Sequence, residues 1–172
     1  ERRRQPLLVE LMTKGEGYTA DDRKRLVALI GDAVRGIIPR YRALAASGQI
    51  ELSTTPHTHP LAPLLVDFAS AREAEPAAEL PAAACYPGGR ARVTAQLESA
   101  LASHAARFGA PAAGVWPAEG AVSNAFLKLL AGTGCRWTAA SESVLAASLR
   151  RAAHELPPRE HFLYRPYRVE GA

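Results

Sequence analysis

The sequence predicts an α/β fold in which parallel strands alternate with helices, and three observations support this. Short apolar segments of strand-like composition alternate with longer segments of helical periodicity. Glycine or proline stands at most of the changes of pattern, where regular structure is expected to break. Such alternation is typical of a parallel sheet built from right-handed crossover units. Because 172 residues with 48% hydrophobic side chains can bury one core, we expect a single domain over residues 1–172.

The first predicted element is an amphipathic helix that begins near Thr19. The Thr-x-x-Asp pattern that ends at Asp22 resembles a capping box, and apolar residues follow at helical spacing as far as Leu44. Pro39 is expected to kink or divide this helix, because its ring removes a backbone donor and clashes with the preceding turn. Gly48 is a suitable helix end.

Further helices and strands are expected to follow in alternation. The predicted strands are 50–54, 113–116, 136–139 and 162–167, and the predicted helices lie near 61–71, from 93 to 108, from 120 to 130 and from 141 to 149. In parallel α/β folds the reactive groups lie just past the carboxyl ends of the strands. The segments to search for a site are therefore 54–60, 116–120 and 139–142.

Composition argues against several classes of function. Of the 21 basic residues 18 are Arg, and they are spread along the chain instead of forming the stripe that nucleic acid requires. Cys85 and Cys135 are far apart and show no zinc-ligand spacing. No apolar run reaches the roughly 18 residues that span a bilayer. We therefore expect a cytoplasmic protein with no nucleic-acid partner, no membrane partner and no cofactor.

The segment 116–120 carries the strongest candidate for catalysis. Glu119 lies at a predicted strand-to-helix turn, where the positive end of the helix dipole favours an ionised carboxylate. Trp116 stands three residues earlier, and exposed indole rings stack on sugars. A structural interpretation stays open, in which Glu119 only complements the helix dipole and Trp116 belongs to the core.

The segment 54–60 contains two histidines, His57 and His59, at a spacing of two residues. On extended backbone their side chains would face the same way, which could bind a metal ion as in a metal-dependent carbohydrate deacetylase. Hydrogen bonding to a substrate and a structural loop role also stay open, and Pro56 and Pro60 favour a turn over a regular strand. Glu51 lies within the first predicted strand and could point into a barrel.

The segment 139–142 ends at Glu142. Ser141 followed by Glu142 is most simply a helix cap with an acidic first turn. Glu142 is therefore a second carboxylate candidate by location alone.

Two long motifs make the chain resemble family 57 glycoside hydrolases. GQIELSTTP at 48–56 followed by HPLAPLL at 59–65 is similar to the second conserved region of that family, and GVWPAEGAVS at 114–123 is similar to the third. The trailing segments 135–139 and 163–167 also resemble the family's poorly characterised amylase-like branch. The resemblance covers about residues 18–167.

The resemblance implies an incomplete (β/α)7 barrel that acts on α-glucans with retention, as an amylase, branching enzyme or 4-α-glucanotransferase. The family's nucleophile falls on Glu119, and its second-region histidine, which lines the sugar site, falls on His59. We expect Trp116, His57 and Glu51 to contribute to substrate binding, with no metal and no cofactor. The family's general acid is an aspartate of a fourth region, which this sequence does not contain. Ser141 also stands where the family usually has the first residue of an Asp-Glu pair.

The length suggests an internal piece of the catalytic barrel, since full barrels require about 250 residues. We therefore expect the isolated chain to be inactive and to self-associate through exposed barrel edges. A sugar-binding module without chemistry is a further alternative.

Overall fold

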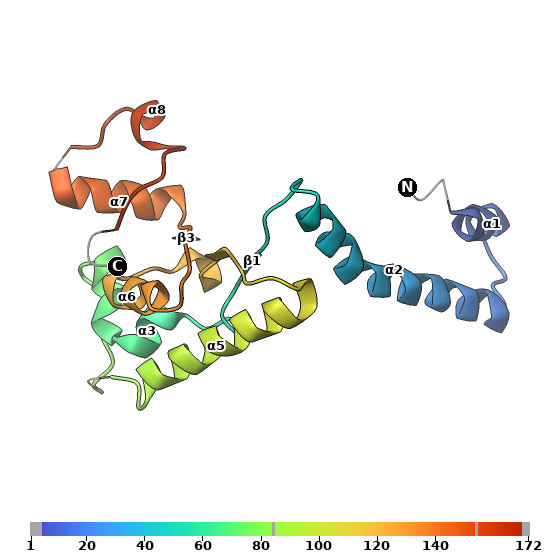
Figure 1. The fold of residues 1–172 in the computed structure, drawn as a ribbon, viewed down its shortest axis with the longest axis horizontal. Helices are drawn as coiled ribbons and strands as arrows, with labels where there is room; N and C mark the ends of the chain where they lie inside the picture. Colours follow the sequence, from blue (N-terminus) through green and yellow to red (C-terminus); the bar gives the residue numbers. More distant parts are fainter. Residues whose placement is uncertain (1–4, 84, 154, 170–172) are drawn as a thin grey trace. The chain divides into compact units, whose positions relative to one another are not determined.

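A computed structural model describes residues 5–83, 85–153 and 155–169 (Figure 1). The chain forms two compact units, residues 1–50 and 51–172. Two compact units can belong to one domain, so the single domain expected from the sequence stays a prediction.

The first unit consists of helix α1 (Pro6–Lys14) and helix α2 (Ala20–Ala46). The predicted capping box begins α2: Asp22 N donates to Thr19 Oγ1 at 3.1 Å, and Thr19 N donates to Asp22 Oδ2 at 2.8 Å. The buried Asp22 also pairs with Lys14. These contacts satisfy donors at the start of α2 and connect its first turn to the end of α1.

Helix α2 continues through Pro39 without dividing. Pro39 is exposed, so the carbonyl that loses its helical partner can bind water instead. The predicted apolar stripe is present and open to solvent. Its exposed members recur at alternating spacings of three and four residues: Val27, Ile30, Val34, Ile37 and Tyr41.

The second unit contains a parallel sheet of three short strands in the order β1-β2-β3. The strands are β1 (Ser53–Thr54), β2 (Gly114–Val115) and β3 (Trp137–Thr138). The helices are α3 (Ala62–Val66), η2 (Phe68–Ser70), α4 (Ala71–Ala74), α5 (Gly89–Phe108), η3 (Ala118–Gly120), α6 (Asn124–Ala131), α7 (Glu142–Ala153) and α8 (Arg159–Phe162). The α/β class is confirmed. The sheet is open, so a barrel stays a prediction.

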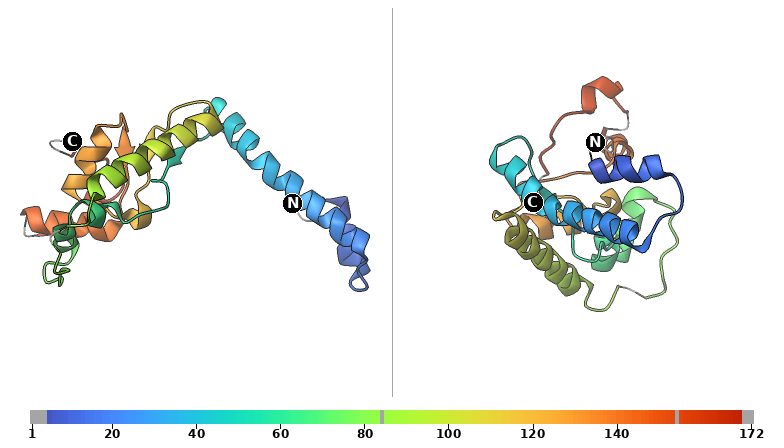
Figure 2. Two further views of the ribbon diagram at one scale, coloured as in Figure 1. Left: turned by 90° about the horizontal axis from the view of Figure 1, so that it is seen from below. Right: turned by 90° about the vertical axis from the view of Figure 1, so that its right-hand side faces the viewer.

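Helices α3, α5 and α6 enclose the core of the second unit against one face of the sheet. Val115 of β2 is fully buried among Val93 and Leu97 of α5 and Phe126 of α6. Helices α3 and α5 lie side by side, as Figures 1 and 2 show. Gly89 permits this approach, because a Cβ there would come within 1.6 Å of the Leu65 carbonyl oxygen.

The predicted strand 162–167 is wrong. Residues 159–162 form α8, and Tyr164 then adopts a left-handed φ of 62°, which interrupts an extended run. Tyr167 Oη donates to the Phe162 carbonyl at 2.7 Å, which folds the segment back on itself. The three other strands are correct in place but shorter than predicted.

The predicted helix bounds also differ from those in the structure, most clearly in two helices. The helix expected at 61–71 is divided into α3, η2 and α4, because Asp67 adopts an extended backbone and its side chain accepts from Ala69 N at 2.9 Å. The helix expected from 120 begins at Asn124, where the Ser123 hydroxyl caps the chain by accepting from Phe126 N at 3.2 Å.

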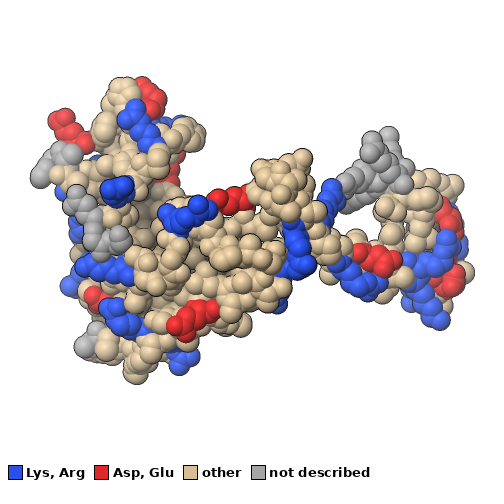
Figure 3. All heavy atoms as spheres, in the orientation of Figure 1, with Lys and Arg blue, Asp and Glu red and all other residues tan. Residues whose placement is uncertain are grey.

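Lys and Arg side chains lie scattered over the face drawn in Figure 3 and do not form a single stripe on that face. None of the helices within the described residues is both long enough and apolar enough to cross a bilayer.

Candidate functional site

The segments that follow β1 and β2 bring His59 and Glu119 together. The strands are parallel neighbours, so their carboxyl ends meet at one edge of the sheet. His59 Nδ1 lies 3.8 Å from Glu119 Oε1. The side chains are 52% and 74% exposed, so both can reach a ligand from solvent. The structure thus joins the two residues that carry the main sequence-based site prediction.

The backbone at this meeting point is held in an unusual conformation. Glu119 has φ 54° and ψ 19°, and His59 and its neighbour Thr58 have φ values of 53° and 68°. Such left-handed conformations cost a non-glycine residue roughly 1–2 kcal/mol. Among the described residues only Tyr164 shares this property, and it lies outside the strand ends. Strain gathered in this way is typical of functional sites.

Two buried prolines hold the segments that carry this strain. Pro56 follows β1 and Pro117 follows β2, and both are among the fully buried side chains. The fixed φ of each ring and its burial restrict the backbone just before His59 and Glu119. The turns therefore have rigid starting points even though their polar side chains are exposed.

Trp116 lies between β2 and Glu119 and is 48% exposed, so it is not part of the core. Its backbone N–H donates to the Thr54 carbonyl at 2.7 Å, which extends the pairing between β1 and β2. The backbone is thus fixed while the indole ring stays accessible. The ring presents an apolar surface close in sequence to the Glu119 carboxylate.

Glu51 precedes β1, and its carboxylate accepts a hydrogen bond from Trp137 of β3. Trp137 Nε1 donates to Glu51 Oε1 at 2.6 Å, and Arg136 Nη2 lies 3.5 Å from Glu51 Oε2. The side chain of Glu51 is 55% exposed. Sequence reasoning named Glu51 and did not anticipate its hydrogen bond with Trp137. The signal was present, since Trp137 falls inside a predicted strand next to the one that leads to Glu119.

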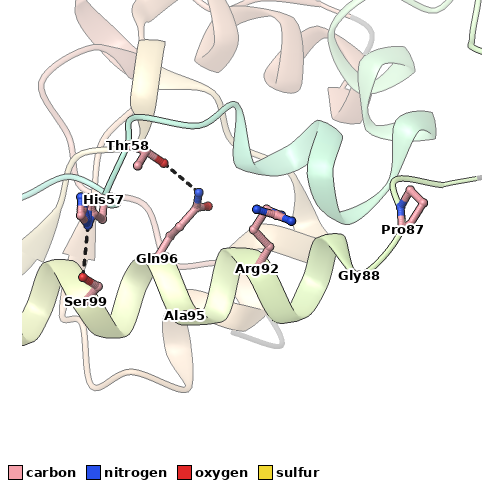
Figure 4. Close-up of a pocket in the computed structure, with 8 residues that line it drawn as sticks. All are labelled: His57, Thr58, Pro87, Gly88, Arg92, Ala95, Gln96 and Ser99. Atoms are coloured by element: carbon pink, nitrogen blue, oxygen red, sulfur yellow. Dashed lines mark hydrogen bonds between the residues drawn. The ribbon is translucent and has the colours of Figure 1, made fainter.

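His57 has different surroundings from His59. Its Nδ1 lies 3.2 Å from Ser99 Oγ of α5, and it lines an open pocket of about 450 Å³ together with Gln96 and Arg92 (Figure 4). Gln96 Nε2 donates to Thr58 Oγ1 at 2.8 Å in the same pocket. These bonds fasten the segment after β1 to α5.

No group of three or more His, Cys, Asp or Glu side chains within residues 5–83, 85–153 and 155–169 is arranged to hold a metal ion. His57 and His59 also face different partners, Ser99 and Glu119. The two-residue spacing suggested a shared direction, but Thr58 and His59 have left-handed backbones, and the strand-like alternation does not apply there.

Glu142 is held at the start of α7 by Arg159. The guanidinium donates from Nε at 2.6 Å and from Nη2 at 2.9 Å to the two carboxylate oxygens. These hydrogen bonds lower the pKa of Glu142 below its ordinary value. Ser141 Oγ accepts from Val144 N at 3.4 Å, as the helix-cap interpretation requires. Glu142 is therefore held ionised and serves the start of a helix.

One comparison with known proteins identifies a relationship. The sequence model of glycosyl hydrolase family 57 matches residues 5–172. No curated protein and no solved structure is significantly similar to the chain.

Proposed function

Because the chain belongs to glycosyl hydrolase family 57, we propose that it supplies the nucleophile, Glu119, of a retaining glycoside hydrolase or transglycosidase acting on α-glucans. One observation carries the proposal: Glu119 lies beside His59 at the joined ends of β1 and β2. Family membership supports a glycosidase, and the positions of the two residues support their roles. In this proposal β1, β2 and β3 are three strands of the family's incomplete (β/α)7 barrel.

The proposed chemistry assigns a task to each side chain. A Glu119 carboxylate oxygen attacks the anomeric carbon, the bond to the leaving oxygen breaks, and a second carboxyl group protonates that oxygen. Water then releases the glycosyl ester with retention, or a sugar hydroxyl does so in transfer. His59 hydrogen-bonds a sugar hydroxyl, and Trp116 stacks against the ring of an α-glucan or oligosaccharide.

We propose that the 172-residue chain binds substrate without turning it over. Retaining catalysis needs a protonated carboxyl roughly 5 Å from the nucleophile. Glu142 is unsuited to that role, because Arg159 lowers its pKa and keeps it ionised. Glu51 already accepts hydrogen bonds from Trp137 and Arg136 at its two carboxylate oxygens. We also propose that the chain self-associates through the open edges of its sheet.

The nucleophile is tested by covalent trapping in a longer protein that contains this sequence together with the family's fourth region. A fluorinated α-glucosyl donor should leave a glycosyl ester on Glu119, located by mass spectrometry of the proteolytic peptides. Glu119→Gln should abolish labelling and turnover, while Glu142→Gln at the neighbouring strand end should still be labelled. A label on any other residue would remove Glu119 from this role.

The non-catalytic alternative makes a different prediction for the same protein. A sugar-binding module would bind maltoheptaose in the unaltered and Glu119→Gln forms alike and would show neither labelling nor turnover. Among the described residues no contact favours the metal-dependent alternative, because His57 and His59 bond to different partners.

A further inference from the structure

The turn that carries His59 is closed by one backbone hydrogen bond and includes a strained residue. His59 N donates to the Pro56 carbonyl at 3.0 Å, so residues 56–59 form a four-residue turn with Thr58 as its third member. Thr58 has a φ of 68°, and a positive φ at this position of a turn normally requires glycine or asparagine. A β-branched residue adopts such a φ only where the surrounding structure holds it there.

Helix α5 supplies the contacts that hold this turn. His57 N donates to the Gln96 carbonyl at 3.1 Å, and Gln96 Nε2 donates to Thr58 Oγ1 at 2.8 Å. His57 Nδ1 lies 3.2 Å from Ser99 Oγ, about one helical turn further along α5. Figure 4 shows the side chains of Gln96 and Ser99 directed from α5 toward the turn. Gln96 therefore contacts both central residues of the turn, one through its backbone and the other through its side chain.

The side-chain amide of Gln96 is only partly paired. Its Oε1 is buried and has no hydrogen-bond partner among the described residues. A buried carbonyl oxygen without a partner costs stability, and such a group in a folded protein calls for an explanation other than stability. An apolar side chain of similar size would fill the same space without that cost. The bond to Thr58 therefore favours a role of Gln96 in placing the turn over a role in packing.

From these contacts we propose that Gln96 is a positioning residue that acts through Thr58. By holding Thr58 it sets where the His59 ring lies relative to Glu119. Thr58 directly precedes His59, so a rotation of its backbone would move the imidazole away from the carboxylate, which is 3.8 Å distant. The inference rests on the proposed function, in which His59 and Glu119 act on one substrate, and it names the residue of a covering helix that keeps the two together.

Nuclear magnetic resonance of the 172-residue chain tests the placement of His59 without turnover. The ring C–H signals of His59 are identified by their loss in His59→Ala, and at a fixed pH Glu119→Gln should shift them, because the two side chains are close. Gln96→Met keeps the length of the side chain and removes the hydrogen bond, so in this background the shift should fall by about half or more. Glu98→Met is the matched control at an exposed position of α5, and it should leave the shift unchanged.

Thr58→Gly separates positioning from stability. Glycine adopts the positive φ freely, so the variant should unfold at a urea concentration no lower than that of the unaltered chain. It lacks the hydroxyl that Gln96 binds, so the response of the His59 signals to Glu119→Gln should still fall as it does in Gln96→Met. In the double variant the two losses of response should not add, since both remove the same hydrogen bond. Lower stability with an unchanged His59 response would indicate a structural role alone and overturn the inference.

Turnover of maltoheptaose by a longer protein that also contains the family's fourth region provides the functional test. Gln96→Met should lower kcat/KM by about tenfold, the effect of about 1.4 kcal/mol. In a His59→Ala background it should change kcat/KM little, because no ring is left to position.

The outcomes separate the inference from the proposed function. Equal losses of kcat/KM in both backgrounds, or an unchanged His59 response in folded Gln96→Met, would overturn the inference and leave Glu119 as the proposed nucleophile. Covalent labelling at another residue would overturn the proposed function, while a reduced His59 response in Gln96→Met would still support the placement of His59 by Gln96.

Discussion

At the residue scale, Glu119 combines exposure with an unfavourable backbone. Its left-handed φ of 54° has no compensating burial, since 74% of the side chain is exposed. The contact with His59 is long and open to solvent, and even an exposed charged pair would contribute only about 0–1 kcal/mol. A residue that costs stability and contributes little to packing is typical of a position kept for function.

The left-handed backbone of Glu119 predicts that Glu119→Gly stabilises the second unit. Glycine adopts the left-handed region freely, so the variant should gain about 0.5–1 kcal/mol in the free energy of unfolding despite the greater entropy of glycine. Urea denaturation followed by circular dichroism measures the gain. Glu98→Gly is the control: Glu98 is exposed within α5, where glycine should cost about 0.5–1 kcal/mol. A destabilised Glu119→Gly variant would show that the carboxylate has a structural role.

The capping box gives a residue-scale prediction about pH. The hydrogen bond from Lys14, followed by those from the Thr19 backbone and side chain, lowers the pKa of Asp22 from 3.8 to about 2. A lowered folded-state pKa means that the stabilisation is complete above pH 3.8 and is lost as pH falls toward 2. Asp22→Asn should therefore be less stable than the unaltered protein at pH 7, and the difference should shrink between pH 4 and pH 2.

Asp21→Asn is the matched control for this titration. Asp21 lies beside Asp22 in the first turn of α2 and is exposed. Both variants retain Glu10, whose pKa is also lowered, chiefly by the hydrogen bond from Arg25. Thermal unfolding followed by circular dichroism should show the stability difference converging for Asp22→Asn only. Equal behaviour of the two variants would mean that the capping box does not stabilise the unit.

At the scale of elements, the sequence predicts features that depend on local contacts. The start of α2 follows from Thr19 and Asp22, which bond within one turn. The positions of β1, β2 and β3 follow from short apolar runs between breakers. The meeting of His59 and Glu119 follows from parallel pairing, which places strand exits at one edge.

Features that depend on distant partners could not be predicted. A strand exists only where a neighbour pairs with it, and here the Tyr167 side chain bonds back to the end of α8 instead. The separation of His57 from His59 depends on left-handed backbones fixed by Pro56 and by Thr58 bonding to α5. The position of the Trp137 ring depends on Gly114 and Glu51, which are distant in the sequence.

The contact between β2 and β3 predicts the cost of filling the Gly114 position. Gly114→Ala places a Cβ where the Trp137 ring lies, so the ring must move, at a cost of about 1–3 kcal/mol. Adding Trp137→Ala should recover part of that loss, because the clash is removed. Gly132→Ala is the control: its φ of −66° suits alanine and its nearest contact is 3.4 Å, so a change within about 1 kcal/mol is expected. If the losses in the free energy of unfolding for Gly114→Ala and Trp137→Ala simply add in the double variant, the contact between Gly114 and the Trp137 ring is contradicted.

At the scale of the whole molecule, the open sheet has edge strands that can pair with a strand of another molecule. Within the described chain β1 and β3 each pair with β2 alone. Thr54 directs its carbonyl to Trp116, so its neighbour Ser53 directs its N–H and C=O away from β2. An unpaired edge of this kind is a template for a strand of a second copy.

We therefore expect the chain to form concentration-dependent oligomers in sedimentation velocity, and Ser53→Pro to weaken them at least tenfold. Proline removes the outward N–H and is tolerated at the first residue of an edge strand, so the fold should persist. Ser53→Ala keeps the N–H and should associate like the unaltered chain. If Ser53→Pro associates as strongly, the edge of β1 is not the contact. Loss of association in Val34→Lys would then assign it to the exposed stripe of α2, where Val34 is 60% exposed.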